Sequence, residues 1–324
     1  MPLLINYNSK QGLRTFLEER GLGMRKKFGQ NFLINPAVRS SLLDALELHQ
    51  GAEVWEIGPG LGAMTTGLLE RGGRVTAFEI DRAFVEMLRE LFASESLGSE
   101  PAFRLVEGDV FKTWPEVNEA YSQADGTAAG EEVFLLGNLP YNIAAALLAD
   151  FIEKRRFFKR IVVTVQREVA LRMAAGPGTT DYSSFSVLCS SVYKISLLPI
   201  IKASSFFPAP RVDSQGVRLD LLAAGEKLPP LFYQMVRALF STRRKKIKNT
   251  LSAFASSVIM KSKLANTKEL SFSAREAAGI AALEALKKAN ISGDCRAETL
   301  GIDEFAKLAT ALSAFLEETV FHES

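Results

Sequence analysis

The chain has 324 residues, 47% of them hydrophobic and 23% charged, with a formal net charge of +2. This composition is typical of a globular protein, and the length allows one large domain plus a smaller one. The two cysteines (Cys189, Cys295) and two histidines (His49, His322) argue against a disulfide framework, a metal site and a histidine-based catalytic triad.

No run of about 18 apolar residues is present, so no membrane span is predicted. The N-terminus, "MPLLINYNSKQGLRTF", lacks the charged and apolar regions of a signal peptide. With so few cysteines, these features favour a cytoplasmic protein in a reducing compartment.

Strands and helices alternate over the first two-thirds of the chain. Residues 35–50 are predicted to be helical, with Asn35 as N-cap and Pro36 at the first helical position. The strands that follow are "EVWEIG", "RVTAFEID", "AFRLVEGDV", "EEVFLLGN" and "RIVVTVQ"; the helices are "LGAMTTGLLERG", "RAFVEMLRELFAS", "IAAALLADFIEK" and "REVALRMAAG". This alternation predicts a parallel sheet with helices on both faces. The extended runs "YKISLLPII" and "VDSQGVRLDLL" predict an antiparallel end to that sheet.

The pattern becomes helical after Leu222, where "AAGEKLPP" is interpreted as a linker. We therefore expect two domains, residues 1–224 with an N-terminal extension over 1–24, and an all-helical domain over 225–324. The stretch "SQADGTAAGEE" (122–132) is interpreted as a flexible surface insertion.

Positive charge is clustered although the net charge is small. The basic runs are "GMRKKFGQ" (23–30), "EKRRFFKR" (153–160) and "STRRKKIKNT" (241–250). Such clusters suggest a polyanionic partner. For any single run, a solvated helix face is the alternative interpretation.

A glycine turn follows the first strand in "EIGPGLGAMT", with Gly58 and Gly60 opening the next helix. Glycines there permit close approach of the backbone to a ligand. Glu79 ends the second strand, where an acid can accept hydrogen bonds from ribose hydroxyls, and Asp109 follows the third, where it can accept from an adenine amine. Gly58, Gly60 and Ala63 also fit a looser dinucleotide pattern, so a nicotinamide enzyme stays open, as does a turn without a ligand.

The fourth strand ends in "NLPY", Asn138 to Tyr141. An exocyclic purine amine is a poor nucleophile until it pyramidalises, which acceptors placed against its N–H bonds would favour. The Asn138 side chain and the Leu139 carbonyl can accept, Pro140 stiffens the turn, and Tyr141 can stack on the base. The alternative is a structural turn in which Asn is the N-cap and Pro the first helical residue.

Two later stretches also suit a nucleic-acid substrate. "SSFFPAPRVDS" places Phe206 and Phe207 before a Pro-x-Pro loop, where an aromatic ring could hold an extruded base against Tyr141. "FSTRRKKIKNTL" (240–251) is predicted to be a basic helix that tracks phosphates, through Arg243, Arg244, Lys245, Lys246 and Lys248.

Taken in order, the motifs "KKFGQNFL", "EIGPGLGAMT", "FEID", "GDV", "GNLPYNI", "FFPAPRVDS", "FSTRRKKIKNTL" and "RAETLGIDEFAKLA" resemble the KsgA/RsmA family of ribosomal RNA adenine N6,N6-dimethyltransferases. The resemblance implies an α/β fold with a Rossmann-like class I methyltransferase sheet. It implies S-adenosylmethionine as methyl donor, and dimethylation of two adjacent adenosines in the 3′-terminal hairpin of small-subunit rRNA within a pre-ribosomal particle. We expect a monomeric enzyme with a role in ribosome biogenesis.

The resemblance also carries site residues. It implies cofactor contacts at Asn31, Leu33, Gly58, Gly60, Glu79, Asp109 and Asn138, and target-adenine contacts at Asn138, Leu139, Pro140 and Tyr141. Phe206 matches the family's stacking Phe, whereas the residues alone do not choose between Phe206 and Phe207. Ser183, the long N-terminus and the 122–132 insertion depart from the family pattern.

Three other functions are weighed against this one. An antibiotic-resistance methyltransferase acting on one large-subunit adenine would share the Asn-x-Pro-Tyr motif, but the C-terminal helical motifs disfavour it. A ribosome-assembly factor that does not need catalysis stays open, although the intact motifs favour catalysis. A nicotinamide dehydrogenase is disfavoured because no acid–base set for hydride transfer is evident.

Overall fold

The computed structural model describes residues 5–23, 30–125, 132–140, 143–222, 228–262 and 268–318. The chain divides into two compact units. The sheet unit comprises Met1–Leu171 and Tyr193–Leu221, and the helical unit comprises Arg172–Val192 and Leu222–Ser324. The helical unit thus takes in a segment that precedes the last two strands of the sheet. The domain boundary expected near residue 225 remains a prediction.

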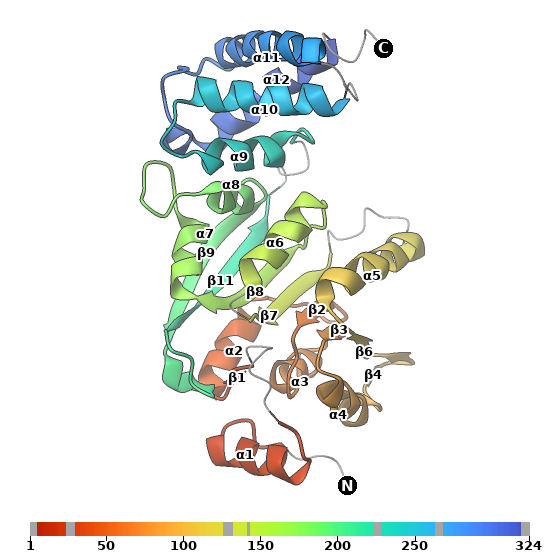
Figure 1. Cartoon of the computed structure of the whole chain (residues 1–324). Helices are drawn as coiled ribbons and strands as arrows, with labels where there is room; N and C mark the ends of the chain where they lie inside the picture. Colours follow the sequence, from red (N-terminus) through yellow and green to blue (C-terminus); the bar gives the residue numbers. More distant parts are fainter. Residues whose placement is uncertain are drawn as a thin grey trace. The chain divides into compact units, whose positions relative to one another are not determined.

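A seven-stranded sheet forms the centre of the sheet unit, in the order β6-β3-β2-β7-β8-β11-β9 (Figure 1). Its strands are β2 (Glu53–Ile57), β3 (Arg74–Glu79), β6 (Phe103–Glu107), β7 (Phe134–Asn138), β8 (Arg160–Gln166), β9 (Tyr193–Ile201) and β11 (Ser214–Leu221). The first five of these strands in chain order, β2, β3, β6, β7 and β8, pair in parallel. Strand β11 runs antiparallel to both β8 and β9. The predicted parallel sheet with an antiparallel end is therefore confirmed.

Helices follow the parallel strands as the alternation predicts. They are α2 (Pro36–Asp44), α3 (Ala63–Glu70), α4 (Arg82–Phe92), α5 (Val110–Asp125), α6 (Ala144–Glu153) and α7 (Arg167–Ala174). The Asn35 side chain accepts from the Val38 N–H, which confirms the predicted cap, although α2 ends at Asp44 rather than near residue 50. Helix α5 was not predicted, and it includes the start of the expected 122–132 insertion, of which 126–131 lie outside the described residues.

The sheet is buried on both faces. On one face, Val54 of β2 and Phe134 of β7 pack with Leu42 of α2 and Leu68 of α3. On the other face, the neighbouring Trp55 lies 5.4 Å from Phe158, ring centre to ring centre. Because successive residues of a strand point to opposite faces, the burial of β2 from Val54 to Ile57 reflects this double coverage.

The sheet unit also contains a helix and two short strand pairs outside the seven-stranded sheet. Helix α1 (Lys10–Glu19), which was not predicted from the sequence, begins at Ser9, whose side chain accepts from the Gly12 N–H. Strand β1 (Phe32–Leu33) pairs antiparallel with β10 (Phe206–Phe207), which follows the 3₁₀ turn η2 (Ala203–Ser205). The hairpin β4 (Ser96–Leu97) and β5 (Glu100–Pro101) precedes β6. The β1–β10 pair joins two sequence motifs that are far apart along the chain.

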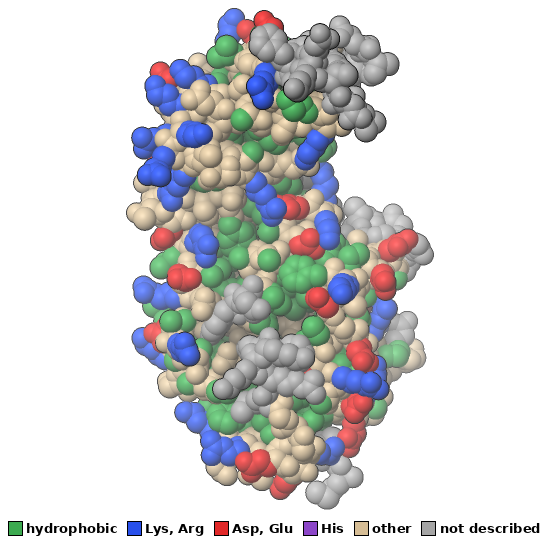
Figure 2. All heavy atoms as spheres, viewed as in Figure 1, with side chains coloured by type: hydrophobic (Ala, Val, Ile, Leu, Met, Phe, Trp, Pro, Cys, Tyr) green, Lys and Arg blue, Asp and Glu red, His purple; other side chains and the backbone are tan. Residues whose placement is uncertain are grey.

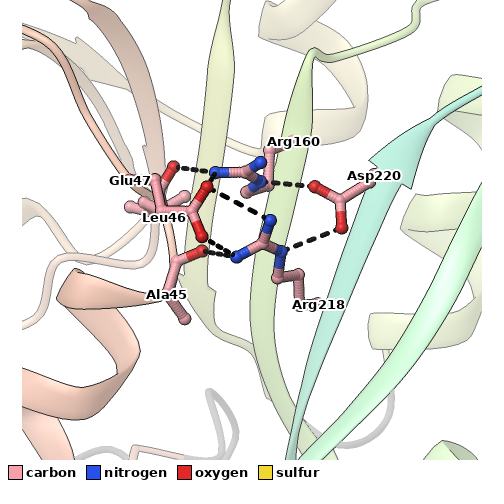
Figure 3. A network of polar contacts seen from close by, with 6 residues as sticks. All are labelled: Ala45, Leu46, Glu47, Arg160, Arg218 and Asp220. Atoms are coloured by element: carbon pink, nitrogen blue, oxygen red, sulfur yellow. Dashed lines mark hydrogen bonds and ion pairs between the residues drawn. The ribbon is translucent and has the colours of Figure 1, made fainter.

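An ion-pair network ties the end of α2 to the antiparallel part of the sheet (Figure 3). Arg160 on β8 and Arg218 on β11 both form ion pairs with Glu47, with N–O distances of 2.8 and 2.6 Å. Both arginines also form ion pairs with Asp220. They donate as well to the carbonyls of Leu46 and Ala45 at the end of the helix. The hydrogen bond from Arg218 and the charge of Arg160 lower the pKa of Glu47. Three segments are thereby held at one corner of the sheet.

The helical unit contains α8 (Ser184–Ser190), α9 (Phe232–Ser241), α10 (Ile247–Ser262), α11 (Lys268–Lys288), η4 (Ala297–Thr299) and α12 (Ile302–Leu316). Ser183, which departs from the family pattern, is the N-cap of α8 in a capping box with Ser186. None of the described helices is both long enough and apolar enough to cross a membrane.

Candidate functional site

The carboxyl ends of four neighbouring parallel strands border one pocket. Because β2 lies between β3 and β7, the strand order reverses here, and ligands of α/β sheets bind at such a switch point. All the residues predicted to contact the cofactor line this pocket: Asn31, Leu33, Gly58, Gly60, Glu79, Asp109 and Asn138. The motifs that contain these residues are far apart in sequence and meet at this pocket. The ligand that the pocket binds remains a prediction from those motifs.

The glycine turn after β2 keeps this pocket open. Gly58 and Gly60 have φ angles of +69° and +57°, which residues with a Cβ rarely adopt. A Cβ at Gly60 would lie 3.1 Å from the Phe32 ring, so a side chain there would press on the β1 side of the pocket. The positive φ angle thus favours glycine at position 60, and a Cβ there would require the Phe32 ring to shift.

Glu79, at the end of β3, is almost completely buried and holds the turn to the strand end. Its Oε2 accepts from the Gly60 N–H at 3.2 Å, and its Oε1 accepts from the Asp81 N–H at 2.8 Å. Burial raises the pKa of Glu79 to about 7, although the two N–H donors act in the opposite direction. Each carboxylate oxygen has a further lone pair that can accept from a hydroxyl in the pocket.

A second buried carboxyl group, Glu56 of β2, lines the same pocket and was not predicted. The Thr65 hydroxyl donates to its Oε2 at 2.6 Å. Burial raises the pKa of Glu56 to about 7; the Thr65 hydrogen bond lowers it and the charge of Glu79 raises it. A cationic ligand beside these two acids would favour their ionised forms.

Asp109 and Ile80 complete the edge of the pocket beside β3 and β6. The Oδ1 of Asp109 accepts from the Phe111 N–H at 3.1 Å, at the start of α5. Ile80 is 47% exposed although it is large and apolar, and it lines the pocket directly after Glu79. Such a side chain can pack on a flat ring; the motif "FEID" contains Ile80, but no role was predicted for it.

Asn138 ends β7, and its side-chain amide is held at both ends. Its Nδ2 donates to the Asn31 carbonyl at 2.7 Å, and its Oδ1 accepts from the Thr164 hydroxyl of β8. The bond to Asn31 fixes the donor end of the amide, so the acceptor end faces Thr164 and retains one lone pair for a substrate N–H.

The rest of the tetrapeptide is placed in part. Leu139 is buried with 2% of its surface exposed, and Pro140 lines the pocket. Tyr141 lies outside the described residues, so its predicted stacking role stays a prediction. Helix α6 begins at Ala144 with Ile143 as N-cap. The structural alternative, in which Asn138 caps this helix and Pro140 is its first turn, is therefore wrong.

The two phenylalanines that the sequence could not separate differ in burial. Phe206 pairs with Leu33 across β1 and β10 and is completely buried in the core. Phe207 is partly exposed, and the Arg14 guanidinium lies 5.8 Å from its ring centre. In this structure Phe206 offers no exposed ring face to a base, so stacking by Phe206 remains a prediction from the family resemblance alone.

The basic run over 240–251 is not a continuous helix, contrary to the expectation. Residues 242–246 form a turn between α9 and α10. Arg243 forms an ion pair with Glu298 and donates to the Thr179 and Thr180 carbonyls, and Lys246 and Lys248 both pair with Asp294. Arg244 and Lys245 are exposed on the turn.

The other basic runs contribute less exposed charge than the sequence suggests. In the run 153–160, Arg156 is buried with its guanidinium 4.3 Å from the Trp55 ring centre, and Arg160 belongs to the network with Glu47. Most of the run 23–30 lies outside the described residues. Among the residues that the structure does describe, no group of three or more His, Cys, Asp or Glu could hold a metal ion.

Comparisons with known proteins agree with the motifs. The ribosomal RNA adenine dimethylase family matches residues 21–278. A protein named ribosomal RNA small subunit methyltransferase A from Treponema denticola is 40% identical over 307 residues, which cover 94% of each chain. A protein of the same name from Pelotomaculum thermopropionicum is 35% identical over 302 residues, covering 92% of this chain and 94% of the other.

Solved structures share the fold. A dimethyladenosine transferase from Plasmodium falciparum matches with a TM-score of 0.67 at 22% identity, covering 87% of this chain and 97% of that one. The 23S rRNA methyltransferase ErmE matches with a TM-score of 0.55 at 20% identity, covering 87% and 99%. These likenesses show an α/β methyltransferase fold and confirm the expected fold class.

Proposed function

The chain belongs to the ribosomal RNA adenine dimethylase family, and we propose that it dimethylates N6 of two adjacent adenosines in the 3′-terminal hairpin of 16S-type rRNA. The methyl donor is S-adenosylmethionine. The proposed substrate is the small-subunit rRNA within a pre-ribosomal particle, so the enzyme contributes to small-subunit biogenesis. We further propose that it acts as a monomer in the cytoplasm.

One observation carries this proposal: Asn138 lines the same pocket as every other predicted cofactor residue. An amide acceptor at that position can meet a base that enters from outside, while the cofactor occupies the pocket. The amide is also fixed by two hydrogen bonds before any substrate arrives, which is what a preorganised acceptor requires.

The cofactor residues divide into two kinds of contact. Glu79 presents carboxylate oxygens for ribose hydroxyls, and Asp109 presents an acceptor for the adenine amine. Ile80 offers an exposed apolar side chain against a flat ring. S-adenosylmethionine, when bound, supplies an electrophilic methyl group on a sulfonium sulfur.

The chain's own residues would then prepare the target amine. Asn138 Oδ1 and the Leu139 carbonyl accept from the two N6–H bonds, which favours a pyramidal nitrogen whose lone pair can attack. Bound S-adenosylmethionine would supply the methyl group to this lone pair, and the amine proton would pass to water. This step needs positioning rather than a strong base.

RNA recognition is assigned to the helical unit. The visible face of its helices carries more Lys and Arg than Asp and Glu (Figure 2). Arg244 and Lys245 are exposed on the turn between α9 and α10, where they can reach phosphates. Ion pairs engage Arg243, Lys246 and Lys248. We therefore propose that these three residues stabilise the turn as well as contact RNA.

The test is methyl transfer from labelled S-adenosylmethionine to small ribosomal subunits that lack the modification, followed by digestion to nucleosides. Label in N6,N6-dimethyladenosine is the expected result. Label on large subunits instead would favour the single-adenine resistance enzyme. Tight binding to small subunits without any label would favour an assembly factor and refute the proposed catalysis.

A further inference from the structure

The N-terminal segment, residues 5–20, forms part of the pocket although it precedes the region that the family matches, residues 21–278. Tyr7 and Leu13 both line the pocket, together with Asn31 and the glycine turn. None of the motifs that point to the cofactor site includes either residue. We call residues 5–20 the N-terminal wall.

Tyr7 connects this wall to the glycine turn. Its hydroxyl donates to the Leu61 carbonyl at 3.0 Å. Burial raises the pKa of Tyr7 to about 12, so the hydroxyl stays protonated and remains a donor at neutral pH. The carbonyl that it holds lies between Gly60 and Gly62, both of which have positive φ angles.

Arg39 connects the wall to β1 on the other side. Its guanidinium donates to the Leu33 carbonyl at 2.7 Å, to the Tyr7 carbonyl at 3.4 Å and to the Asn8 side chain. Leu33 is itself a predicted cofactor residue. The wall is therefore bonded to both the glycine turn and β1, which are two sides of the same pocket.

Helix α1 packs firmly enough to keep the wall in place. Its buried residues Leu13, Phe16 and Leu17 share a core cluster with Leu61 and with the α4 side chains Phe84, Met87, Leu88 and Phe92. Outside this cluster, Arg20 forms an ion pair with Glu90 of α4 at 2.9 Å. Leu13 is 1% exposed in all, so its pocket-facing atoms belong to a packed surface.

We propose that the N-terminal wall is an integral part of the cofactor site, in which Leu13 supports the pocket wall through its packing in the α1–α4 cluster and Tyr7 is a positioning residue that holds the glycine turn through Leu61. This inference rests on the proposed function for the identity of the cofactor. It adds two residues to the site and gives the N-terminal extension a role.

Binding and order of the wall are then linked. A ligand that contacts the wall must stabilise its ordered form by the same free energy by which the ordered wall strengthens binding. S-adenosylhomocysteine, the product that keeps all but the methyl group, is therefore expected to slow hydrogen exchange of the amides over residues 5–20.

The test is calorimetric binding of S-adenosylhomocysteine to the full chain, without RNA. Tyr7→Phe removes one hydrogen bond to the turn, so Kd is expected to rise about threefold to tenfold. Leu13→Ala should raise Kd by at least as much, and Leu13→Met, which nearly conserves volume, should restore it. The control Lys10→Ala, at an exposed position of the same helix, should bind like the wild type.

A kinetic readout separates positioning from loss of structure. With RNA present, Tyr7→Phe should raise KM for S-adenosylmethionine and leave kcat nearly unchanged, whereas partial unfolding would lower kcat and the binding stoichiometry. Wild-type Kd in both Tyr7→Phe and Leu13→Ala would overturn the inference, as would an equal loss in Lys10→Ala. If a variant does not fold, the wild type provides the test. Hydrogen exchange over residues 5–20 that is the same with and without saturating S-adenosylhomocysteine would overturn the inference.

The failure of this inference is distinct from failure of the proposed function. A wild-type chain that binds S-adenosylhomocysteine but methylates no rRNA refutes the proposed function. The Kd values of the Tyr7 and Leu13 variants would then still test the role of the N-terminal wall. A wild-type chain that does not bind S-adenosylhomocysteine refutes both.

Discussion

The Thr164 hydroxyl on β8 donates a hydrogen bond to Oδ1 of Asn138 on β7, and the two residues are register partners in the sheet. Thr164 is 2% exposed, so water competes little for this bond. Since the opposite end of the amide donates to Asn31, a buried threonine in the sheet sets which way the predicted acceptor points.

Thr164→Val is expected to lower kcat by roughly fivefold, because it removes a hydrogen bond worth about 1 kcal/mol while conserving shape. Binding of S-adenosylhomocysteine should change little. Thr164→Ser, which keeps the hydroxyl, should recover most of the rate. Steady-state kinetics on modification-free subunits would measure this, and a wild-type kcat in Thr164→Val would show that Asn138 is oriented without Thr164.

Asn138→Ala is expected to abolish dimethylation, with a fall in rate of at least about a hundredfold, as for loss of one preorganised donor or acceptor. Loss of the hydrogen bonds to the Asn31 carbonyl and the Thr164 hydroxyl should cost on the order of 1–3 kcal/mol of stability. Circular dichroism and thermal unfolding would establish that the variant is folded. Retained turnover in a folded variant would refute the catalytic role of Asn138.

Glu56 predicts a pH dependence of stability in the ligand-free protein. Its pKa is raised from 4.5 to about 7, so its stabilising contribution is full below pH 4.5 and is lost as the pH rises through 7. The loss is on the order of 3 kcal/mol. Urea unfolding from pH 5 to 8 should show this decline in the wild type and a flatter profile in Glu56→Gln.

The matched control for this measurement is Glu70→Gln, an exposed position on α3. It should retain the wild-type pH profile. Superimposable profiles for Glu56→Gln and the wild type would mean that Glu56 ionises in the folded protein as it does in the unfolded chain.

Arg244→Gln with Lys245→Gln is expected to weaken rRNA binding and to reduce its dependence on salt. The slope of log K against log salt should fall by roughly 0.7–0.9 for each phosphate that the variant no longer neutralises. Arg243 is spared because it bonds Glu298 and the carbonyls of Thr179 and Thr180. The charge-matched control is Lys287→Gln with Lys288→Gln, at exposed positions near the end of α11. An equally reduced slope in that control would mean that the turn has no special part in binding.

Much of the fold could be predicted because its signals are local. The parallel strands appear as short apolar runs separated by helices, and Asn35 with Pro36 marks a helix start in adjacent residues. The prediction of a continuous basic helix was wrong because the composition between α9 and α10 is that of a helix. In the structure residues 242–246 form a turn, which places Arg243 against Glu298. That partner comes from far along the chain and leaves no local signal.

The same distinction holds at the site. Gly58, Glu79, Asp109 and Asn138 could be predicted because strand ends and spacing identify them. Tyr7, Leu13 and Thr164 could not, since each acts through a partner in another element: the Leu61 carbonyl, the α4 cluster and the Asn138 amide. The sequence also could not show which of Phe206 and Phe207 is buried, because the two residues are adjacent and identical.

The pairing of β1 with β10 also orders events during synthesis. One side of the pocket, Asn31 to Leu33, is made early, but the strand that pairs with it leaves the ribosome only after β9. Strand β11, which fills the place between β8 and β9, is made later still. A nascent chain that stops after β8 can form the parallel strands but lacks this pairing, so the pocket is completed late, near the end of synthesis of the sheet unit.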